Sequence, residues 1–229
     1  MPRLYFDLET VPNPLYGKEP PAPTKVEPKP VPGNIKDPEK IQARALLNQQ
    51  KAEQDTKDAY AKVLKDHESH YRSYALYAWK SQVVSVAWAV DDGRIESITG
   101  PSERDLLLKF LTAVEHMGPG VQWCAYNALR FDLAVLEARR IYHNIKSVRI
   151  PYDAKPWDQM LVADPMTILP FTKDRKSLKA VCSVLQIREP YESGANVYDQ
   201  FQAGLLKEIN KHNCDDVRAL REVCIRCGI

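Results

Sequence analysis

Alternating apolar and polar residues open the chain, and the segment RLYFDLET indicates a short buried strand over residues 1–10. A β-branched run, QVVSVAWAV, predicts a second strand over residues 82–90. Asp-Asp-Gly at 91–93 predicts a hairpin turn that leads into a third strand at 94–99. A fourth strand is expected at 121–126.

Helical periodicity follows these strands. Ser102, with Asp105 three residues later and an apolar stripe behind it, predicts a capped helix. A second helix is expected from Phe131 to about Ile145. The strands and helices alternate, which predicts an α/β sheet with a helical tail. In the tail, helices are expected at 158–164 (capped by Asp158), 175–186, 198–203 and 205–226.

Residues 12–80 interrupt this pattern between the first two strands. The stretch 12–38 holds nine of the 17 prolines, so we expect an extended surface segment. Asp37 and Pro38 supply a helix cap and an N1 proline, and residues 39–78 are polar enough for one long or two shorter exposed helices. We therefore expect a single domain over residues 1–229 that carries 12–80 as an insertion.

Composition and charge exclude several classes of protein. The 229 residues include 32 Lys plus Arg and 30 Asp plus Glu, so the net charge of +2 excludes a strongly polybasic binder. No apolar run reaches the roughly 20 residues of a membrane helix, and a charge follows Met1 too early for a secretory signal. Five cysteines, an odd number, indicate reduced thiols. We expect an intracellular, cytoplasmic protein without a membrane segment.

Asp7 and Glu9 are the first candidates for chemistry. Because they lie two apart on a strand, both carboxylates project from the same face. Two buried acids on one side are costly unless a cation lies between them, and Mg²⁺ prefers such oxygen ligands. The alternative is that both acids face solvent at the edge of the sheet.

Two further groups of polar residues could join Asp7 and Glu9 in one site. Asn127-x3-Phe131-Asp132 lies where a strand is expected to pass into a helix. His212 and Asp216 lie four apart on the last helix and therefore share one face. Asp215 would point roughly 100° away, which makes it the poorer ligand.

In this order the three motifs resemble the DEDD superfamily of 3′–5′ exonucleases (DnaQ-like). More narrowly, the chain is similar to stand-alone proteins related to the proofreading exonuclease domain of family-B DNA polymerases. The similarity covers residues 1–10 and about 80–225. It implies an RNase H-like mixed sheet flanked by helices. It also implies hydrolysis at the 3′ end of single-stranded DNA by two Mg²⁺ or Mn²⁺ ions, with release of nucleoside 5′-monophosphates.

The resemblance also implies roles for the acids. Asp7 matches the carboxylate that bridges the two metals, which lie about 4 Å apart in such sites. Glu9 and Asp216 match the other ligands of the metal that holds the attacking water. Asp132 matches the ligand of the second metal.

Five other residues match positions with supporting roles. His212 has the residue type of the superfamily's histidine branch but the spacing of its tyrosine branch, and either side chain can orient or deprotonate water. The alternative is a histidine on the helix surface. Asn127, Phe131, Leu8 and Thr10 match positions near the terminal nucleotide, whereas a turn-forming Asn and a core Phe are the alternatives for the first two.

Three functions remain open at this stage: a 3′–5′ exonuclease acting on DNA, a 3′–5′ exoribonuclease of the same fold, and a non-catalytic nucleic-acid-binding or polymerase-associated module. We expect nucleic acid as the partner, DNA ahead of RNA, and a monomer that can work with a polymerase or replication protein. Basic residues at 139–149 could neutralise the phosphate backbone or form a solvated face. Tyr71, Tyr74 and Tyr77 could stack bases or pack onto the sheet.

Overall fold

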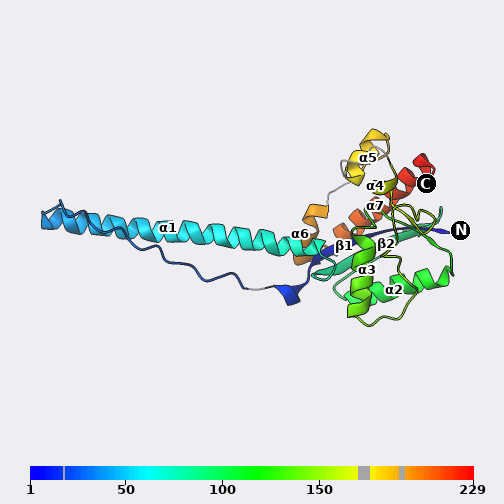
Figure 1. Ribbon diagram of the computed structural model, residues 1–229, viewed down its shortest axis with the longest axis horizontal. Coiled ribbons are helices and arrows are strands. Elements are labelled where there is room, and N and C mark those ends of the chain that lie inside the picture. Colours follow the sequence, from blue (N-terminus) through cyan, green and yellow to red (C-terminus); the bar gives the residue numbers. More distant parts are fainter. Residues whose placement is uncertain (18, 170–175, 191–193) are drawn as a thin grey trace. The chain divides into compact units, whose positions relative to one another are not determined.

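The computed structural model describes residues 1–17, 19–169, 176–190 and 194–229, and the chain forms two compact units (Figure 1). The first unit joins Met1–Tyr16 to Tyr74–Ile229, and the second is Gly17–Ser73. None of the helices in the described part of the chain is long and apolar enough to cross a membrane.

A five-stranded mixed sheet forms the centre of the first unit, in the order β3-β2-β1-β4-β5. β1 pairs antiparallel with β2, which pairs antiparallel with β3, whereas β4 is parallel to β1 and β5 is parallel to β4. This arrangement confirms the predicted mixed sheet and makes the first strand central. The strands are β1 (Arg3–Pro12), β2 (Ser81–Val90), β3 (Glu96–Thr99), β4 (Gln122–Cys124) and β5 (Val162–Ala163).

Helices cover both faces of the sheet (Figure 1). On one face, α2 (Glu103–His116) and α3 (Asp132–Tyr142) pack over the apolar side of β1. There the Phe6 ring lies 5.8 Å from Phe110 and 5.6 Å from Trp123, between ring centroids. On the other face, α7 (Leu206–Cys227) crosses the polar side of the same strand.

The C-terminal half contains one wrong prediction. The helix expected at 158–164 does not form: a turn leads into β5, which pairs with β4, and Asp164 then caps the short α4 (Pro165–Ile168). A strand of two residues is too short to show a periodicity, so its backbone pairing could not be read from the pattern. The other helices are α5 (Leu178–Val184), α6 (Val197–Gln202) and the 3₁₀ turn η4 (Gly194–Asn196).

Two details of helix starts differ from expectation. Ser102 precedes α2, but its hydroxyl donates to Asp105 Oδ2 at 2.6 Å and makes no capping bond to the backbone. Asp158 does not cap a helix, and its carboxylate accepts from the Lys155 N–H within a turn. The start of the helix predicted at 175–186 falls partly outside the described residues, and the described helix begins at Leu178.

The second unit consists of one long helix and an extended segment. α1 (Pro38–Ser73) is a single helix, and Asp37 Oδ1 accepts from the Glu39 N–H at 3.0 Å, so the predicted cap is confirmed. The proline-rich segment runs back along this helix. Its Val26 N–H donates to Thr56 Oγ1, and its Lys29 carbonyl accepts from Asn48 Nδ2. That 12–80 is an insertion within one exonuclease domain remains a prediction.

Candidate metal and catalytic site

The central strand supplies two acids to the site. Asp7 and Glu9 alternate with the core residues Phe6 and Leu8 and therefore face α7. Glu9 is buried, whereas Asp7 is partly exposed. The register of β1 against β2 shifts between Glu9 and Thr10, which marks a bulge immediately after the second acid. Bulges next to functional sites commonly re-aim a side chain.

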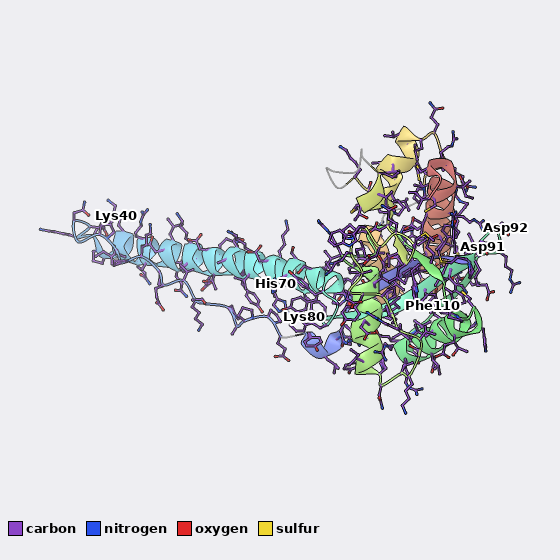
Figure 2. The ribbon with its side chains drawn as sticks, turned by 45° about the vertical axis from the view of Figure 1, so that its right-hand side comes forward. Lys40, His70, Lys80, Asp91, Asp92 and Phe110 are labelled. Atoms are coloured by element: carbon purple, nitrogen blue, oxygen red, sulfur yellow. The ribbon has the colours of Figure 1, made fainter. Side chains whose placement is uncertain are left out.

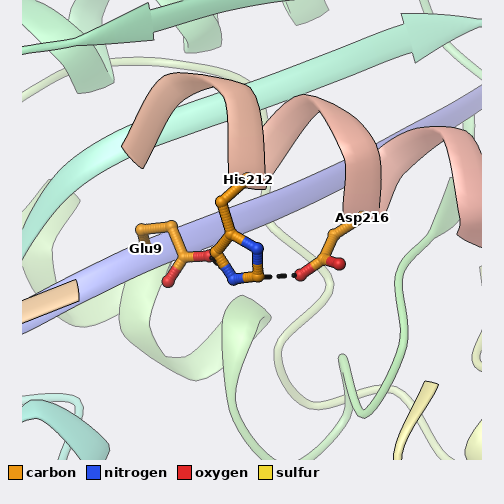
Figure 3. A group of neighbouring side chains, drawn as sticks. All are labelled: Glu9, His212 and Asp216. Carbon is orange, nitrogen blue, oxygen red and sulfur yellow. Dashed lines mark ion pairs between the residues drawn. The ribbon is translucent and has the colours of Figure 1, made fainter. Parts of the chain in front are cut away.

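The last helix brings two more residues to these acids (Figure 3). His212 Nε2 lies 3.1 Å from Glu9 Oε1 and 3.5 Å from Asp216 Oδ2, so the imidazole stands between the two carboxylates. The expected i, i+4 pairing on one helical face is therefore present. Asp215 Oδ1 lies instead 3.6 Å from Arg218 Nε, consistent with the choice of Asp216 as the ligand.

A polar chain attaches this helix to the sheet. Ser85, opposite Glu9 in the register, shares a 2.8 Å hydrogen bond with the Thr99 hydroxyl. Thr99 Oγ1 donates in turn to Asn210 Oδ1 at 3.0 Å. One turn further along α7, Asn213 Nδ2 donates to Asp7 Oδ2 at 3.3 Å, and the Asn213 side chain is fully buried. The helix is thus held in register with both acids of β1.

Asp132 comes from a third element, the helix α3. It is the first residue of α3, where the positive end of the helix dipole favours a carboxylate. Its side chain is buried, and it accepts hydrogen bonds from its own N–H and from the Leu8 N–H. The bond to Leu8 ties it to the strand between the two acids.

The carboxylates disfavour each other's ionised forms. Desolvation, followed by the nearby Asp216, Glu9 and Asp132, raises the pKa of Asp7 well above its ordinary value. Desolvation raises the pKa of Asp132 to about 8, with Asp164 and Glu9 adding to the effect. Desolvation also raises the pKa of Asp216 to about 7, although His212 opposes the shift. An added positive charge would relieve this repulsion.

Asp164, which the sequence reasoning missed, organises the loop before Asp132. Its buried carboxylate accepts from the N–H groups of Asn127 at 2.9 Å, Leu129 at 3.3 Å and Met166 at 3.0 Å. Asn127 has a left-handed backbone with φ of 65°, and these bonds support that conformation. The Asp-Pro pair at 164–165 is a helix-start signal that could have revealed this residue.

Gly194 borders the site from η4. A Cβ at this position would lie 3.7 Å from Glu9 Oε2 and 3.8 Å from His212 Nε2. Its φ is outside the left-handed region, so glycine serves here to keep space open beside the acids. No periodic pattern surrounds this glycine, and its role could not be predicted without the fold.

The donor set suits a divalent cation of the Mg²⁺ or Mn²⁺ type. Glu9, His212 and Asp216 each offer one ligand atom, and these atoms all lie within 4.8 Å of one another. Carboxylate oxygens, which dominate the cluster once Asp7 and Asp132 are included, are the ligands these hard cations prefer. The space beside Gly194 and the raised pKa values of the acids fit the same interpretation.

The four residues matched to positions near the terminal nucleotide make contacts within the protein. Leu8 is buried in the core, and the Thr10 hydroxyl donates to the Ala75 carbonyl at 2.8 Å. Asn127 and Phe131 are partly exposed in the loop before α3, where the Asn127 carbonyl accepts from the Phe131 N–H. Substrate contacts by these four residues remain predictions.

Three arginines of the basic stretch at 139–149 form ion pairs within the protein. Arg139 is buried and bonds to Glu103 through two nitrogens, at 2.8 and 2.6 Å. Arg140 pairs with Glu137, and Arg149 pairs with Asp153. The partners Glu137 and Asp153 lie just outside the stretch, and Glu103 lies far from it in sequence. The sequence of the stretch itself therefore did not reveal that these arginines are paired.

The chain is similar to known proteins in sequence and in fold. The sequence profile of a family described as "Predicted 3′-5′ exonuclease related to the exonuclease domain of PolB" matches residues 69–220. Among solved structures, the family B DNA polymerase from the hyperthermophilic archaeon Pyrobaculum calidifontis is similar in fold, with a TM-score of 0.51 and 18% sequence identity. The similarity covers 65% of this chain and 22% of the polymerase chain. A search among curated proteins finds no match.

Proposed function

Because the chain belongs to the family of predicted 3′–5′ exonucleases related to the exonuclease domain of PolB, we propose that it is an active, metal-dependent exonuclease. The proposed reaction is hydrolysis of the terminal phosphodiester at the 3′ end of DNA, with single-stranded DNA as the substrate. One observation carries this proposal. Glu9 of β1 and Asp216 of α7 flank His212, and burial with mutual repulsion among the acids raises the pKa values of Asp7, Asp132 and Asp216.

Asp7, Glu9, Asp132 and Asp216 are the residues that would hold two divalent cations. When bound, the cations would lower the pKa of the attacking water and neutralise charge on the leaving 3′-oxygen. Asn213 holds the Asp7 carboxylate in place from α7, and the Leu8 N–H does the same for Asp132.

His212 is suited to handle the proton of the attacking water. As the water oxygen bonds to the terminal phosphorus, a proton passes to His212 Nε2. The bond from phosphorus to the 3′-oxygen of the preceding nucleotide then breaks, its electron pair stays on that oxygen, and the oxygen takes up a proton from solvent to become a 3′-hydroxyl. A nucleoside 5′-monophosphate leaves. Glu9 and Asp216, which flank Nε2, stabilise the imidazolium formed in this step.

The proposal is tested with 5′-labelled oligonucleotides of single-stranded DNA, duplex DNA and RNA, each with Mg²⁺, Mn²⁺ or EDTA. We expect a ladder of progressively shorter labelled products from single-stranded DNA, dependent on metal. Asp7→Ala should abolish the ladder, and Asp215→Asn, which changes the neighbouring acid outside the site, should not.

Other results would favour the alternatives. A ladder from RNA alone would indicate an exoribonuclease. Binding of DNA without any shortening, under all metal conditions, would indicate a non-catalytic module. Immediate release of a labelled mononucleotide would show the opposite polarity and contradict the proposal.

A further inference from the structure

An exposed aromatic surface lies beyond the end of β1 that carries Glu9. We call it the aromatic platform. Its two exposed members are Trp79 and Tyr77, which keep 57% and 51% of their surface accessible. Large rings exposed together to this extent commonly mark a binding surface. The platform consists of Tyr16, Tyr74, Tyr77, Trp79 and Lys80.

The platform is a connected cluster. The rings of Tyr16 and Trp79 meet edge to face, with their centroids 5.6 Å apart and their planes at 89°. Lys80 Nζ lies 3.9 Å from the centroid of the Tyr74 ring, 4.7 Å from that of Trp79 and 5.7 Å from that of Tyr77. A cation therefore lies against three rings, and two of these rings belong to residues more than half exposed.

Two hydrogen bonds tie the platform to β1, the strand that carries Asp7 and Glu9, and to the residue after it. The Asn13 N–H donates to the Lys80 carbonyl at 2.8 Å, and the Thr10 hydroxyl donates to the Ala75 carbonyl at 2.8 Å. Thr10 directly follows Glu9. All these residues belong to the first compact unit, so the platform and the acids share one framework. Figure 2 labels Lys80, the platform's cation, where the chain enters β2.

We propose that the aromatic platform binds single-stranded nucleic acid and holds the strand whose 3′ end occupies the acid cluster. Open ring faces accept unpaired bases by stacking, whatever their sequence, and a lysine among them can neutralise a backbone phosphate. A duplex hides its base faces, so this surface selects single strands. The inference rests on the proposed function and extends it by naming the surface that recognises the single strand.

Binding is measured by fluorescence anisotropy with a labelled oligothymidylate in EDTA, so that no hydrolysis occurs. Trp79→Ala should raise Kd about tenfold or more, because loss of one stacked base has an effect of this order. Trp79→Phe keeps a ring and should retain most of the affinity, whereas Trp79→Leu keeps only apolar surface and should behave like Ala. The matched control is Trp157→Ala, since Trp157 is 76% exposed but lies outside the platform.

Two further ligands and one variant separate stacking from charge. An abasic strand of the same length should bind the wild type weakly and be insensitive to Trp79→Ala. The duplex should bind weakly as well. Lys80→Gln should reduce the slope of log Kd against log salt by about 0.7, the value for one phosphate contact on a single strand.

The inference is overturned if Trp79→Ala binds oligothymidylate as tightly as the wild type, or if the duplex and the abasic strand bind as well as the intact single strand. Failure of the proposed function is detected separately, with wild-type protein and a nitrophenyl ester of thymidine 5′-monophosphate, which has no strand for the platform to hold. Platform-dependent binding without hydrolysis of this ester or of oligonucleotides would leave the binding surface standing and reject the exonuclease.

Discussion

Asn213 on α7 donates its side-chain N–H to Asp7 Oδ2 on β1, across the face of the sheet where the acids converge. The asparagine directly follows His212, so one helical turn positions both the imidazole and one of the carboxylates proposed to hold the metals. The orientation of Asp7 therefore depends on a neutral neighbour as well as on its own strand.

Asn213→Ala should lower turnover about 10- to 100-fold, as loss of an outer-shell partner of a metal ligand commonly does. KM for a short oligonucleotide should change little, because Asn213 acts through Asp7 rather than on the nucleotide. Steady-state kinetics with Mn²⁺ provides the measurement. Asn210→Ala, one turn earlier on the same helix, is the control and should affect stability more than turnover. Equal turnover of Asn213→Ala and wild type would refute the positioning role.

In the metal-free protein, stability should fall as pH rises. The pKa of Asp132 is about 8 and that of Asp216 about 7, whereas an unfolded aspartate titrates near 3.9. Between about pH 4 and pH 8 the folded chain therefore retains protons that the unfolded chain has lost. The stability present below the unfolded pKa is lost progressively across this window.

Asp132→Asn removes one titrating group and should therefore weaken the pH dependence of the stability of the metal-free protein. Urea denaturation in EDTA across this pH range should show the variant more stable than wild type at the alkaline end. Mn²⁺ should raise the Tm of the wild type most strongly at the same end, because the acids are then ionised. A stability that rises with pH for wild type and variant alike would count against a buried, mutually repelling acid cluster.

His212→Ala should cost about 10²–10⁴ in single-turnover rate, the usual contribution of a positioned general base. His212→Tyr should recover part of this loss, since the spacing to Asp216 suits a tyrosine in the related branch. The rate of the wild type should fall toward acid pH as the imidazole becomes protonated, and the Tyr variant should lack that component.

Metal titration distinguishes the two possible roles of His212. If it acts on the water, Mn²⁺ affinity should be nearly unchanged in His212→Ala. A sharp loss of affinity would instead make His212 a ligand, together with Glu9 and Asp216. An Ala variant with the rate and affinity of wild type would make the histidine a bystander.

Gly194→Val should impair catalysis with little change in Tm. A Cβ at this position meets Glu9 and His212 only at ordinary contact distances, so the fold should tolerate it, whereas the larger side chain would fill the space beside the acids. Mn²⁺ affinity and turnover are the measurements, and both should fall at least about tenfold. Gly33→Val is the control, because nothing lies within 4 Å of a Cβ there. Unaltered metal binding would show that this space is not used.

Arg139→Met should destabilise the fold by about 3–5 kcal/mol, the usual cost of removing one member of a buried ion pair. Its partner Glu103 is buried and would keep two contacts, the Val83 N–H at 2.7 Å and His143 Nε2 at 2.7 Å, but would lose the bidentate guanidinium. Chemical denaturation provides the measurement. Arg149→Met, which breaks an exposed pair with Asp153, should have little effect. Similar stability of both variants would mean that Glu103 finds compensation elsewhere.

Much of the fold follows from local pattern. The strand holding Asp7 and Glu9, the hairpin at 91–93 and the long polar helix each have a periodicity or a cap that acts within a few residues. β5 was missed because its pairing with β4 joins residues about forty positions apart. Only the sheet as a whole makes two residues, Val162 and Ala163, into a strand.

The site likewise contains residues that local spacing predicts and residues that only the fold brings together. Spacing alone placed His212 and Asp216 on one helical face, and the structure shows them together with Glu9. Asn213, Asp164 and Gly194 act through hydrogen bonds or free space across elements distant in sequence. The Asp-Pro pair at 164–165 is a local signal for the first role of Asp164, capping α4, but the contacts across elements have no signature in the residues around them. For the same reason, the burial of Arg139 against Glu103 was not foreseen.

β1 is the central strand of its sheet, yet residues 17–73 separate it from the rest of its unit. A single backbone cut in the extended part of that segment would leave the strand on a short peptide, held by hydrogen bonds to β2 and β4, by bonds such as that from Asn213 to Asp7, and by core packing. The peptide would carry Asp7 and Glu9, and the large fragment would carry Asp132 and Asp216. Neither fragment has a complete acid cluster, so the chain is organised for fragment complementation, in which activity returns only when the two pieces reassociate.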